Sequence, residues 1–486
     1  MLNPNWREGV GGRNASAQPS RSGAAVAALP VLPVWGAPRI QPAEGLVDNT
    51  SADSLRKLAF RASLGMVFVM MAVLPELLAS LLHANTYLLY FVVPPAIFGA
   101  VFTGGLGRTL RHRPAQFWIC FFCCMALSVP FSSWKGDSVG SLKAYAYLSL
   151  PIMFTIAGLT LTFREVRSTF TTIGLAGLVV IIAARFTATE DNGRLDMTQA
   201  TGTIGNSNDL ASHLVLVLPF LLFIALDRRR AAAIRCAVIA PAAYALWIIF
   251  GTASRGAVLA LACAFLFAVF RAPGKQKVAA LAVGAILAAA IPVMLSGNAA
   301  ERLASLVGGK HEEAAESGEA RSYLLKQSLI YTVQHPLFGI GLAQFANYEG
   351  RLSIEAGKAG NWHETHNSFT EVSSECGIPA VIFFALGIGS AILSVNRTWR
   401  KARLGGYTEI ANACFCYLLA MVGFMVTITF LSNPYRFYLP AMIGLAIALS
   451  ATAEREMSAS RLAEPVRSPG WAGPVSARTP LRTVQP

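Results

Sequence analysis

The chain has 486 residues, of which 54% are hydrophobic and 14% are charged. Since soluble domains carry about 25% charged residues, this composition excludes an ordinary soluble domain and indicates a membrane protein. The formal net charge is +14. The basic residues lie mainly in short loops and terminal segments, as in the cytoplasmic parts of membrane proteins, so we expect membrane lipids and no nucleic acid as partners.

Both ends of the chain differ in composition from the rest. Residues 1–57 are rich in Ala, Gly, Pro, Ser and Arg, and they lack the basic start, apolar run and cleavage site of a secretory signal. Without lasting periodicity, this segment is predicted to be a disordered cytoplasmic tail. Residues 453–486 are expected to form a second tail of the same kind.

Between the tails, runs of about 20 apolar residues can each cross a hydrocarbon core of about 30 Å. They predict an all-α polytopic membrane protein with about 12 transmembrane helices, nine within 58–296 and three within 376–452. The predicted spans are 60–82, 86–104, 115–132, 144–162, 169–186, 209–226, 232–251, 255–271, 278–296, 376–395, 409–431 and 435–451.

The charges of the loops predict the orientation. Every second loop contains two or more Lys or Arg, as in "GRTLRHR", "FREVR", "DRRR", "RAPGKQK" and "NRTWRKAR", whereas the intervening loops are sparser in these residues. The positive-inside rule places the basic loops and both termini in the cytoplasm.

The segment 297–375, between spans nine and ten, is then one large periplasmic loop. It contains an acidic patch and a predicted amphipathic helix from Arg321 to about Gln334, which Pro336 ends. The sequence has no phosphate-binding loop of the G-x-x-x-x-G-K type, and we expect no cofactor.

Two histidines, His363 and His366, lie in the stretch "NWHETHNSFTEVSSECG" of this loop. Their spacing is one residue short of H-E-x-x-H and no third ligand follows, so we predict no metal site. A structural histidine and a general base remain open. If a helix begins near Thr365, then Asn367, Glu371 and Glu375 form one row beside His366, and this row would face a cavity at the outer membrane surface. A carboxylate close to the imidazole would raise its basicity.

Two arginines are also candidates. Arg255, in "GTASRGA", lies between two spans, where it either snorkels to the interface or binds an anion. Arg321 lies near the start of the predicted amphipathic helix, where it either pairs with Glu319 or Glu316 or holds a phosphate at the helix N-terminus. The stretch "TGTIGNSNDLASHL" (201–214) either caps the next span, with Asn208 as the N-cap, or lines a ligand cavity.

Four motifs in this order, over roughly residues 200–385, resemble those of the O-antigen ligase-like superfamily. They are "TGTIGNSNDLA", "TASRGA", "RSYLLKQSL" followed by "HPLFGIGLAQF", and "THNSFTEVSSECGIP". The superfamily includes lipid A core–O-antigen ligases, O-antigen polymerases and protein O-oligosaccharyltransferases. The resemblance implies a C-type glycosyltransferase fold in the bacterial inner membrane, with a periplasmic, metal-independent active site. It further implies that a glycan on undecaprenyl diphosphate is transferred, with inversion, to an acceptor hydroxyl.

The resemblance also implies residue roles. His366 matches the essential histidine of the family's "HN" motif, and Arg255 and Arg321 correspond to its two essential arginines. We therefore expect these three residues to be catalytic, and the two arginines, with Asn367 and Glu371, to bind substrate. His363 has no counterpart, and no role transfers to Arg194 or Gln199.

The acceptor is left open between lipid A core, a second lipid-linked glycan and a protein, with a ligase favoured. A polysaccharide transporter is the alternative from another class. Transporters place charges at the bilayer midplane and often contain inverted repeats, whereas the polar residues here gather at one face and no repeat is visible.

Overall fold

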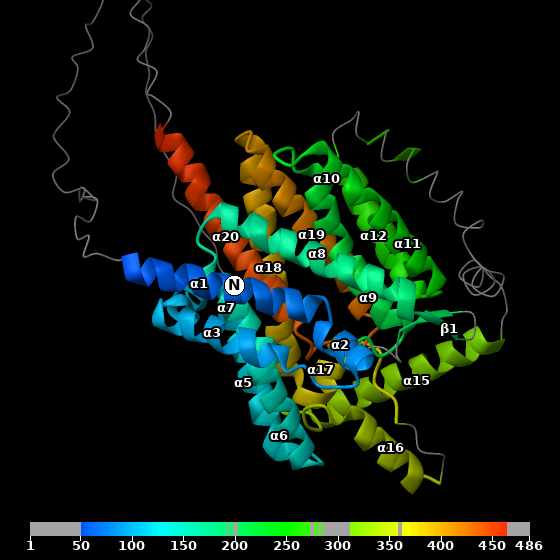
Figure 1. Ribbon diagram of the computed structural model, residues 1–486. Helices are drawn as coiled ribbons and strands as arrows, with labels where there is room; N and C mark the ends of the chain where they lie inside the picture. The colour runs from blue at the N-terminus through cyan, green and yellow to red at the C-terminus, as the bar shows by residue number, and fades with distance from the viewer. Residues whose placement is uncertain are drawn as a thin grey trace, which may run out of the picture. The chain divides into compact units, whose positions relative to one another are not determined.

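The computed structural model describes residues 50–191, 194–197, 203–272, 277–278, 281–282, 284, 312–357 and 362–463. Most of these residues are helical (Figure 1). The predicted span 278–296 and the first part of the large loop lie mainly outside the described residues.

Seven helical stretches among the described residues are long and apolar enough to cross a membrane. They are α5 with the short turn η1 (Arg113–Phe131), α6 through α7 (Lys135–Leu159), α8 (Phe163–Thr187), α9 (Ser207–Leu226), α10 with α11 (Ala232–Gly251), α18 (Ile378–Leu404) and α19 (Thr408–Ile428). The chain is therefore a helical polytopic membrane protein, as predicted. The number of twelve spans stays a prediction.

The first predicted span, 60–82, is broken rather than continuous. Helix α1 (Thr50–Met71) and helix α2 (Leu74–Leu82) meet at an angle of 61°. Val73 lies at the break with φ 50°, and Pro75 follows in the first turn of α2. Proline cannot donate a backbone hydrogen bond, and its ring clashes with the carbonyl group four residues earlier in a helix, which here is that of Met71, the last residue of α1. The helix therefore cannot continue straight through Pro75, and the chain turns here.

Three further predicted spans coincide with helices. They are 86–104 with α3 (Leu88–Phe102), 255–271 with α12 (Arg255–Arg271) and 435–451 with α20 (Tyr438–Ala463). The terminal segments are shorter than expected, because residues 50–57 belong to α1 and residues 453–463 to α20. Both stretches continue the helix beyond its apolar part, where composition alone places the boundary too early.

The remaining elements lie between these helices. A short helix, α4 (Gly105–Leu110), follows α3, and two strands, β1 (Thr189–Asp191) and β2 (Arg194–Asp196), pair antiparallel after α8. Helices α15 (Glu312–Gln334), α16 (Phe345–Glu355) and α17 (Ser368–Cys376) precede α18. Figure 1 shows α15, α16 and α17 at the same end of the helices as β1.

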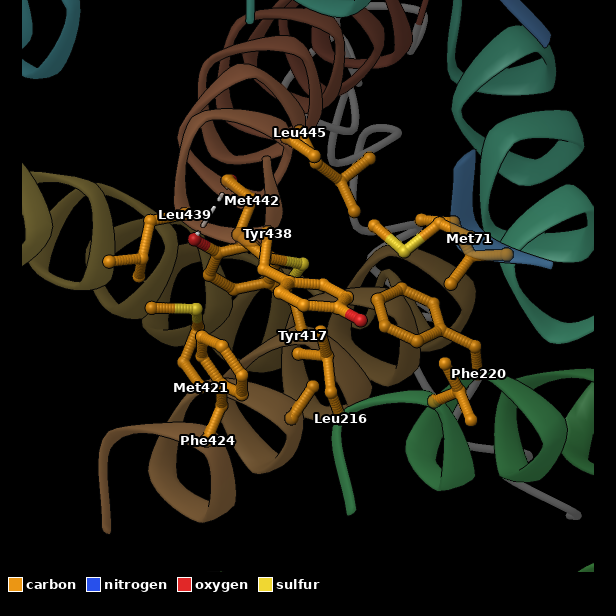
Figure 2. Packing of buried hydrophobic residues seen from close by; sticks show 14 of the residues in the cluster. Met71, Leu216, Phe220, Tyr417, Met421, Phe424, Tyr438, Leu439, Met442 and Leu445 are labelled. Atoms are coloured by element: carbon orange, nitrogen blue, oxygen red, sulfur yellow. Dashed lines mark hydrogen bonds between the residues drawn. The ribbon is translucent and has the colours of Figure 1, made fainter. Parts of the chain in front are cut away.

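The core forms where α19 and α20 pack against α9 and α1. Figure 2 shows the side chains that meet there, which are Met71, Leu216, Phe220, Tyr417, Met421, Phe424, Tyr438, Leu439, Met442 and Leu445. The Tyr417 hydroxyl donates a hydrogen bond of 3.1 Å to the Met442 carbonyl oxygen. A buried hydroxyl in a membrane protein needs such a partner, because no water is available to it.

Glycines let α9 approach its neighbours closely. A Cβ atom on Gly177 of α8 would lie 2.7 Å from the Val217 side chain, and one on Gly423 of α19 would lie 2.7 Å from Val215. Small residues at such contacts are typical of helix packing in membranes. They fix α9, whose first turn lies beside the site described next.

Candidate functional site

A cleft of ≈ 770 Å³ lies between the first half of α12, the middle of α15 and the segment before α17. Its lining includes Arg255, Arg321, His366 and Asn367. Four of the five residues singled out as catalytic or substrate-binding in the sequence therefore meet in one cavity, although three different segments carry them.

Arg255 is the first residue of α12, and the turn before it positions the helix. Ala253 has φ 49°, and the Thr252 hydroxyl donates a hydrogen bond of 2.6 Å to the Ile249 carbonyl oxygen. Ser254 is the N-cap residue, but its side chain makes no capping hydrogen bond. The first amides of α12 and the Arg255 guanidinium thus form a positive end at the cleft, and such helix ends favour anions.

Gly256 allows the start of α12 to pack against the segment after α19. A Cβ atom there would lie 3.2 Å from the ring of Phe430, tighter than ordinary contact. Both residues line the cleft.

Arg321 does not lie at a helix N-terminus, contrary to the expectation. Helix α15 begins at Glu312, so Arg321 is in its third turn. The helix N-terminus that adjoins the cleft is that of α12.

The two cleft arginines are not neutralised by acidic neighbours. Among the ion pairs of the described residues, none includes Arg255 or Arg321. The alternative in which Arg321 pairs with Glu319 is therefore not found, and the side chain of Glu316 lies outside the described residues. Burial and the charge of Arg255 lower the pKa of Arg321. The cleft therefore presents two adjacent positive groups that an anion would stabilise.

His366 precedes α17 and has left-handed backbone, with φ 52°. Its backbone amide donates a hydrogen bond of 2.9 Å to Ser432 Oγ. One residue earlier, the Thr365 hydroxyl donates 3.0 Å to the Asn367 carbonyl oxygen and lies 3.4 Å from Ser432 Oγ. These bonds hold a conformation that a residue other than glycine adopts at a cost.

A second set of bonds ties the start of α17 to the segment after α19. Ser368 Oγ donates to the Leu431 carbonyl oxygen over 2.6 Å and accepts from the Asn433 amide over 3.0 Å. Asn367 is the N-cap of α17, and its side-chain oxygen accepts from the amides of Phe369 and Thr370. The side-chain oxygen of Asn367 is thereby occupied, and its amide nitrogen is left for a ligand.

The His366 ring has no carboxylate partner in the described part of the chain, so the expected imidazole–carboxylate pair is not formed. Burial, the charge of Arg321 and the charge of His363 lower the pKa of His366 to about 4. The imidazole is accordingly neutral at pH 7 and can accept a proton. An anion bound between the arginines would offset their charge and raise this basicity.

The row of carboxylates on α17 does not face the cleft. Glu371 is 7% exposed and is not among the residues that line the cavity, and its Oε2 lies 3.4 Å from the Thr365 hydroxyl. Burial, together with the charge of Glu375, raises the pKa of Glu371. Glu371 therefore touches the segment that holds His366 rather than the cavity.

Glu375 holds a neighbouring helix. Its carboxylate accepts hydrogen bonds from the amides of Ala343 (3.0 Å) and Phe345 (2.9 Å), at the start of α16, and from the Tyr435 hydroxyl (2.7 Å). Burial raises the pKa of Glu375 to about 7. A carboxylate that satisfies two amides at a helix N-terminus is structural.

The N-cap of α9 is Asn206, not Asn208. The Asn206 side chain accepts from the amides of Asn208 and Asp209, at 2.9 and 3.1 Å. Asn208 instead accepts a hydrogen bond of 2.9 Å from Arg194, which also donates 2.9 Å to the Thr252 carbonyl oxygen. Arg194, to which the sequence assigned no role, thus connects β2 to the turn before Arg255.

Sequence reasoning missed Ser432, Thr429 and Phe430. They follow α19 in "TFLSNP", where a polar break interrupts an apolar run, and that break is the only local signal. His363 is exposed and does not line the cleft, and Gln199 lies outside the described residues. Within the described ranges, no group of three His, Cys, Asp or Glu side chains is arranged to hold a metal ion.

Residues 240–385 match the family model described as O-antigen ligase. The matched region contains Arg255, Arg321 and His366. No curated protein matches the chain.

Proposed function

We propose, from the match of residues 240–385 to the O-antigen ligase family, that the chain is a membrane glycosyltransferase of the O-antigen ligase-like superfamily. The enzyme transfers a glycan from undecaprenyl diphosphate to an acceptor hydroxyl at the periplasmic face of the bacterial inner membrane. One observation carries the proposal: two arginines that form no ion pair within the described residues line one cleft with a neutral histidine, and this cleft continues along the apolar side of α12.

The positive side of the cleft fits a diphosphate. Arg255 and Arg321 can each offer a planar fork of N–H donors to phosphate oxygens, and the first amides of α12 add a helix N-terminus. As the bond between the anomeric carbon and the phosphate oxygen breaks, negative charge grows on the leaving undecaprenyl diphosphate. Donors placed at that charge stabilise the transition state.

The apolar side of the cleft fits the lipid. Val258, Leu259 and Ala262 continue the lining along α12 away from Arg255, and Leu259 is 46% exposed. A polyprenyl chain bound along this face would stay within the hydrocarbon layer while its diphosphate reaches the arginines. Phe430 supports the opposite wall.

His366 is the proposed general base. Its neutral ring nitrogen takes the proton from the acceptor hydroxyl while the hydroxyl oxygen attacks the anomeric carbon from the side opposite the diphosphate, which inverts the configuration. Because the bound diphosphate offsets the charge of Arg321, the basicity of His366 rises when the donor is in place. Asn367 offers its amide nitrogen to the substrate, and Glu371 acts indirectly by contacting Thr365.

The orientation follows from charge. The cleft lies at the ends where α9, α12 and α18 begin, whereas the basic residues Arg228–Arg230, Arg271 and Lys401–Arg403 lie at the ends where these helices finish. Under the positive-inside rule, this charge distribution supports a periplasmic cleft and cytoplasmic termini.

The test uses purified enzyme, a lipid-linked glycan and candidate acceptors. Glycan transfer by the native chain and its loss in His366→Ala is the expected result. No transfer to lipid A core, to a second lipid-linked glycan or to protein, with movement of the lipid-linked glycan across the membrane instead, would favour a transporter. In cells lacking the protein, accumulation of long glycans on the carrier identifies a ligase, and accumulation of single repeat units identifies a polymerase.

A further inference from the structure

A second cavity lies at the other end of the membrane-spanning helices from the cleft. Its volume is ≈ 610 Å³, and its lining contains four arginines, Arg164, Arg167, Arg229 and Arg230. The first two lie in the opening turns of α8, and the other two follow the last residue of α9. The cleft adjoins the first turn of α9, so the length of a membrane-spanning helix separates the two cavities.

Ion pairs hold three of these arginines in place. Asp227 accepts from Arg167 over 2.6 Å and from Arg230 over 3.1 Å, while Arg229 contacts Glu409 over 2.6 Å. Asp227 and Glu409 do not line the cavity, so they orient the guanidinium groups from behind. These ion pairs therefore orient Arg167, Arg229 and Arg230 in the absence of a ligand.

One positive charge is left over. The four arginines face three carboxylates, those of Asp227, Glu409 and Glu456. Arg164 is exposed and takes part in none of the ion pairs of the described residues. A surplus of one matches a single phosphodiester, which carries one negative charge.

Hydroxyl groups complete the polar surface. Ser168, Thr171 and Thr172 of α8 line the cavity together with the arginines. Arg230 donates a hydrogen bond of 2.6 Å to the Thr171 hydroxyl. The hydroxyls of Ser168 and Thr171 donate to the carbonyl oxygens of Arg164 and Arg167, over 3.2 and 2.8 Å. The donors that suit phosphate oxygens here are therefore the arginine forks, and the hydroxyl oxygens can accept from other headgroup atoms.

An apolar stripe runs from the cavity along α8. Ser168 and Thr172 lie on the same helical face as Leu175 and Ile182, which are 44% and 50% exposed. From Thr172 to Ile182 the helix rises about 15 Å, which is about half the thickness of the hydrocarbon layer. The cavity is therefore continuous with a surface as long as one leaflet's acyl chains.

We propose that this cavity binds the phosphodiester headgroup of an anionic phospholipid in the leaflet opposite the cleft. The arginines hold the phosphate, the α8 hydroxyls contact the rest of the headgroup, and the acyl chains lie along Leu175 and Ile182. Basic pockets between helices at the cytoplasmic surface suit such headgroups because that leaflet is rich in anionic lipid. The proposal requires no glycosyl transfer.

Lipid retention tests it directly. The full chain is reconstituted in nanodiscs of mixed phosphatidylglycerol and phosphatidylcholine, released, and examined by native mass spectrometry for bound lipid. We expect phosphatidylglycerol to be retained in preference to phosphatidylcholine. Arg164→Ala should lower that retention about fivefold, and Arg164→Glu should lower it further. Because Arg164 is exposed, both variants should fold.

A matched control lies on the same membrane face. Arg400 is exposed near the end of α18 and does not line the cavity. Arg400→Glu changes the net charge as Arg164→Glu does, and it should leave retention unchanged. Equal loss in both variants, or equal retention of the two lipids by the native chain, would overturn the proposal.

A soluble phosphate compound distinguishes the source of the ligand. Glycerol 3-phosphate shares the phosphate chemistry but has no acyl chains. We expect it not to displace phosphatidylglycerol at equal concentration, because the α8 stripe contributes only to lipid binding. Full displacement would show a site for a soluble anion and would refute a lipid site.

Discussion

The backbone amide of His366 donates a hydrogen bond of 2.9 Å to Ser432 Oγ, and His366 lies there with φ 52°. The two residues belong to segments before α17 and after α19, so their contact ties the proposed base to the membrane-spanning core. The strained backbone of His366 depends on this bond, which makes Ser432 a positioning residue.

Ser432→Ala should lower kcat about tenfold and leave KM for the lipid-linked donor unchanged. The variant loses one hydrogen bond that holds a strained backbone, a loss worth about 1–2 kcal/mol, while the arginines stay in place. Steady-state kinetics on the purified variant measures this, and Ser432→Thr, which keeps the hydroxyl, should restore most of the rate. A rise in KM with kcat intact would contradict the positioning role.

His366→Ala should reduce transfer by about 10²–10⁴-fold, the usual contribution of a general base. The protein should still accumulate in the membrane, since the His366 ring makes no hydrogen bond within the described residues. His363→Ala is the matched control, because His363 is exposed and outside the cleft lining. An equal loss in both variants would point to a paired-histidine site instead.

The pH dependence of kcat/KM should show the low pKa of His366. The free enzyme's His366 has a pKa lowered to about 4 by burial and by Arg321, so the base is deprotonated at neutral pH. The rate should be flat between about pH 6 and 8 and should fall as the pH drops toward about 4. Arg321→Gln removes a positive neighbour, so its acid limb should move to higher pH. If the acid limb stays at the same pH in Arg321→Gln, then Arg321 does not lower the pKa of His366.

Arg255→Lys and Arg321→Lys should each raise KM for the donor about tenfold, because lysine keeps the charge but loses the bidentate fork. Initial rates over a range of donor concentrations provide the measurement. Arg351→Lys is the control, since Arg351 lies on α16, outside the cleft, and contacts only Glu355, at 3.8 Å, among the carboxylates of the described residues. Unchanged KM in both cleft variants would exclude a diphosphate clamp.

The stability of the protein should fall as pH rises through about 7, in part because of Glu375. Burial raises its pKa to about 7 in the folded protein, so the folded state binds a proton that the unfolded state has already lost. The resulting stabilisation is present below the unfolded pKa and disappears as pH increases through the folded pKa. Thermal unfolding in detergent between about pH 5 and 8 should show this decline, and Glu375→Gln should make it shallower. If the stability of Glu375→Gln declines with pH as steeply as that of the native chain, groups other than Glu375 cause the pH dependence.

Several features were predictable because their causes are local. A membrane span requires about 20 apolar residues. The helical stretches Arg113–Phe131, Ser207–Leu226, Ala232–Gly251 and Thr408–Ile428 begin and end within three residues of the predicted boundaries, whereas α8 begins earlier and α18 ends later than predicted, at Phe163 and Leu404. The order of the motifs likewise predicted the match to the O-antigen ligase family. His366, Arg255 and Arg321 were found in the same way, by residue type and neighbours, and all three line the cleft.

Other features depend on contacts between distant segments. The break at Val73, the start of α15 at Glu312 and the N-cap at Asn206 each replaced a plausible local alternative. The local free energies of such alternative helix ends differ by only about 1 kcal/mol, so packing against the rest of the chain decides between them.

The sequence by itself determined a helical membrane protein, its resemblance to this superfamily and its three charged or titratable candidates, because apolar length and motif order are properties of the chain alone. Only the tertiary structure decided what surrounds them. In it, the Glu375 carboxylate accepts hydrogen bonds from the amides of Ala343 and Phe345 rather than facing the cavity. The hydroxyl of Ser432 accepts a hydrogen bond from the backbone amide of His366. The reason is physical: a buried carboxylate or a strained backbone is tolerated only where specific partners satisfy it, and here those partners come from other segments of the chain.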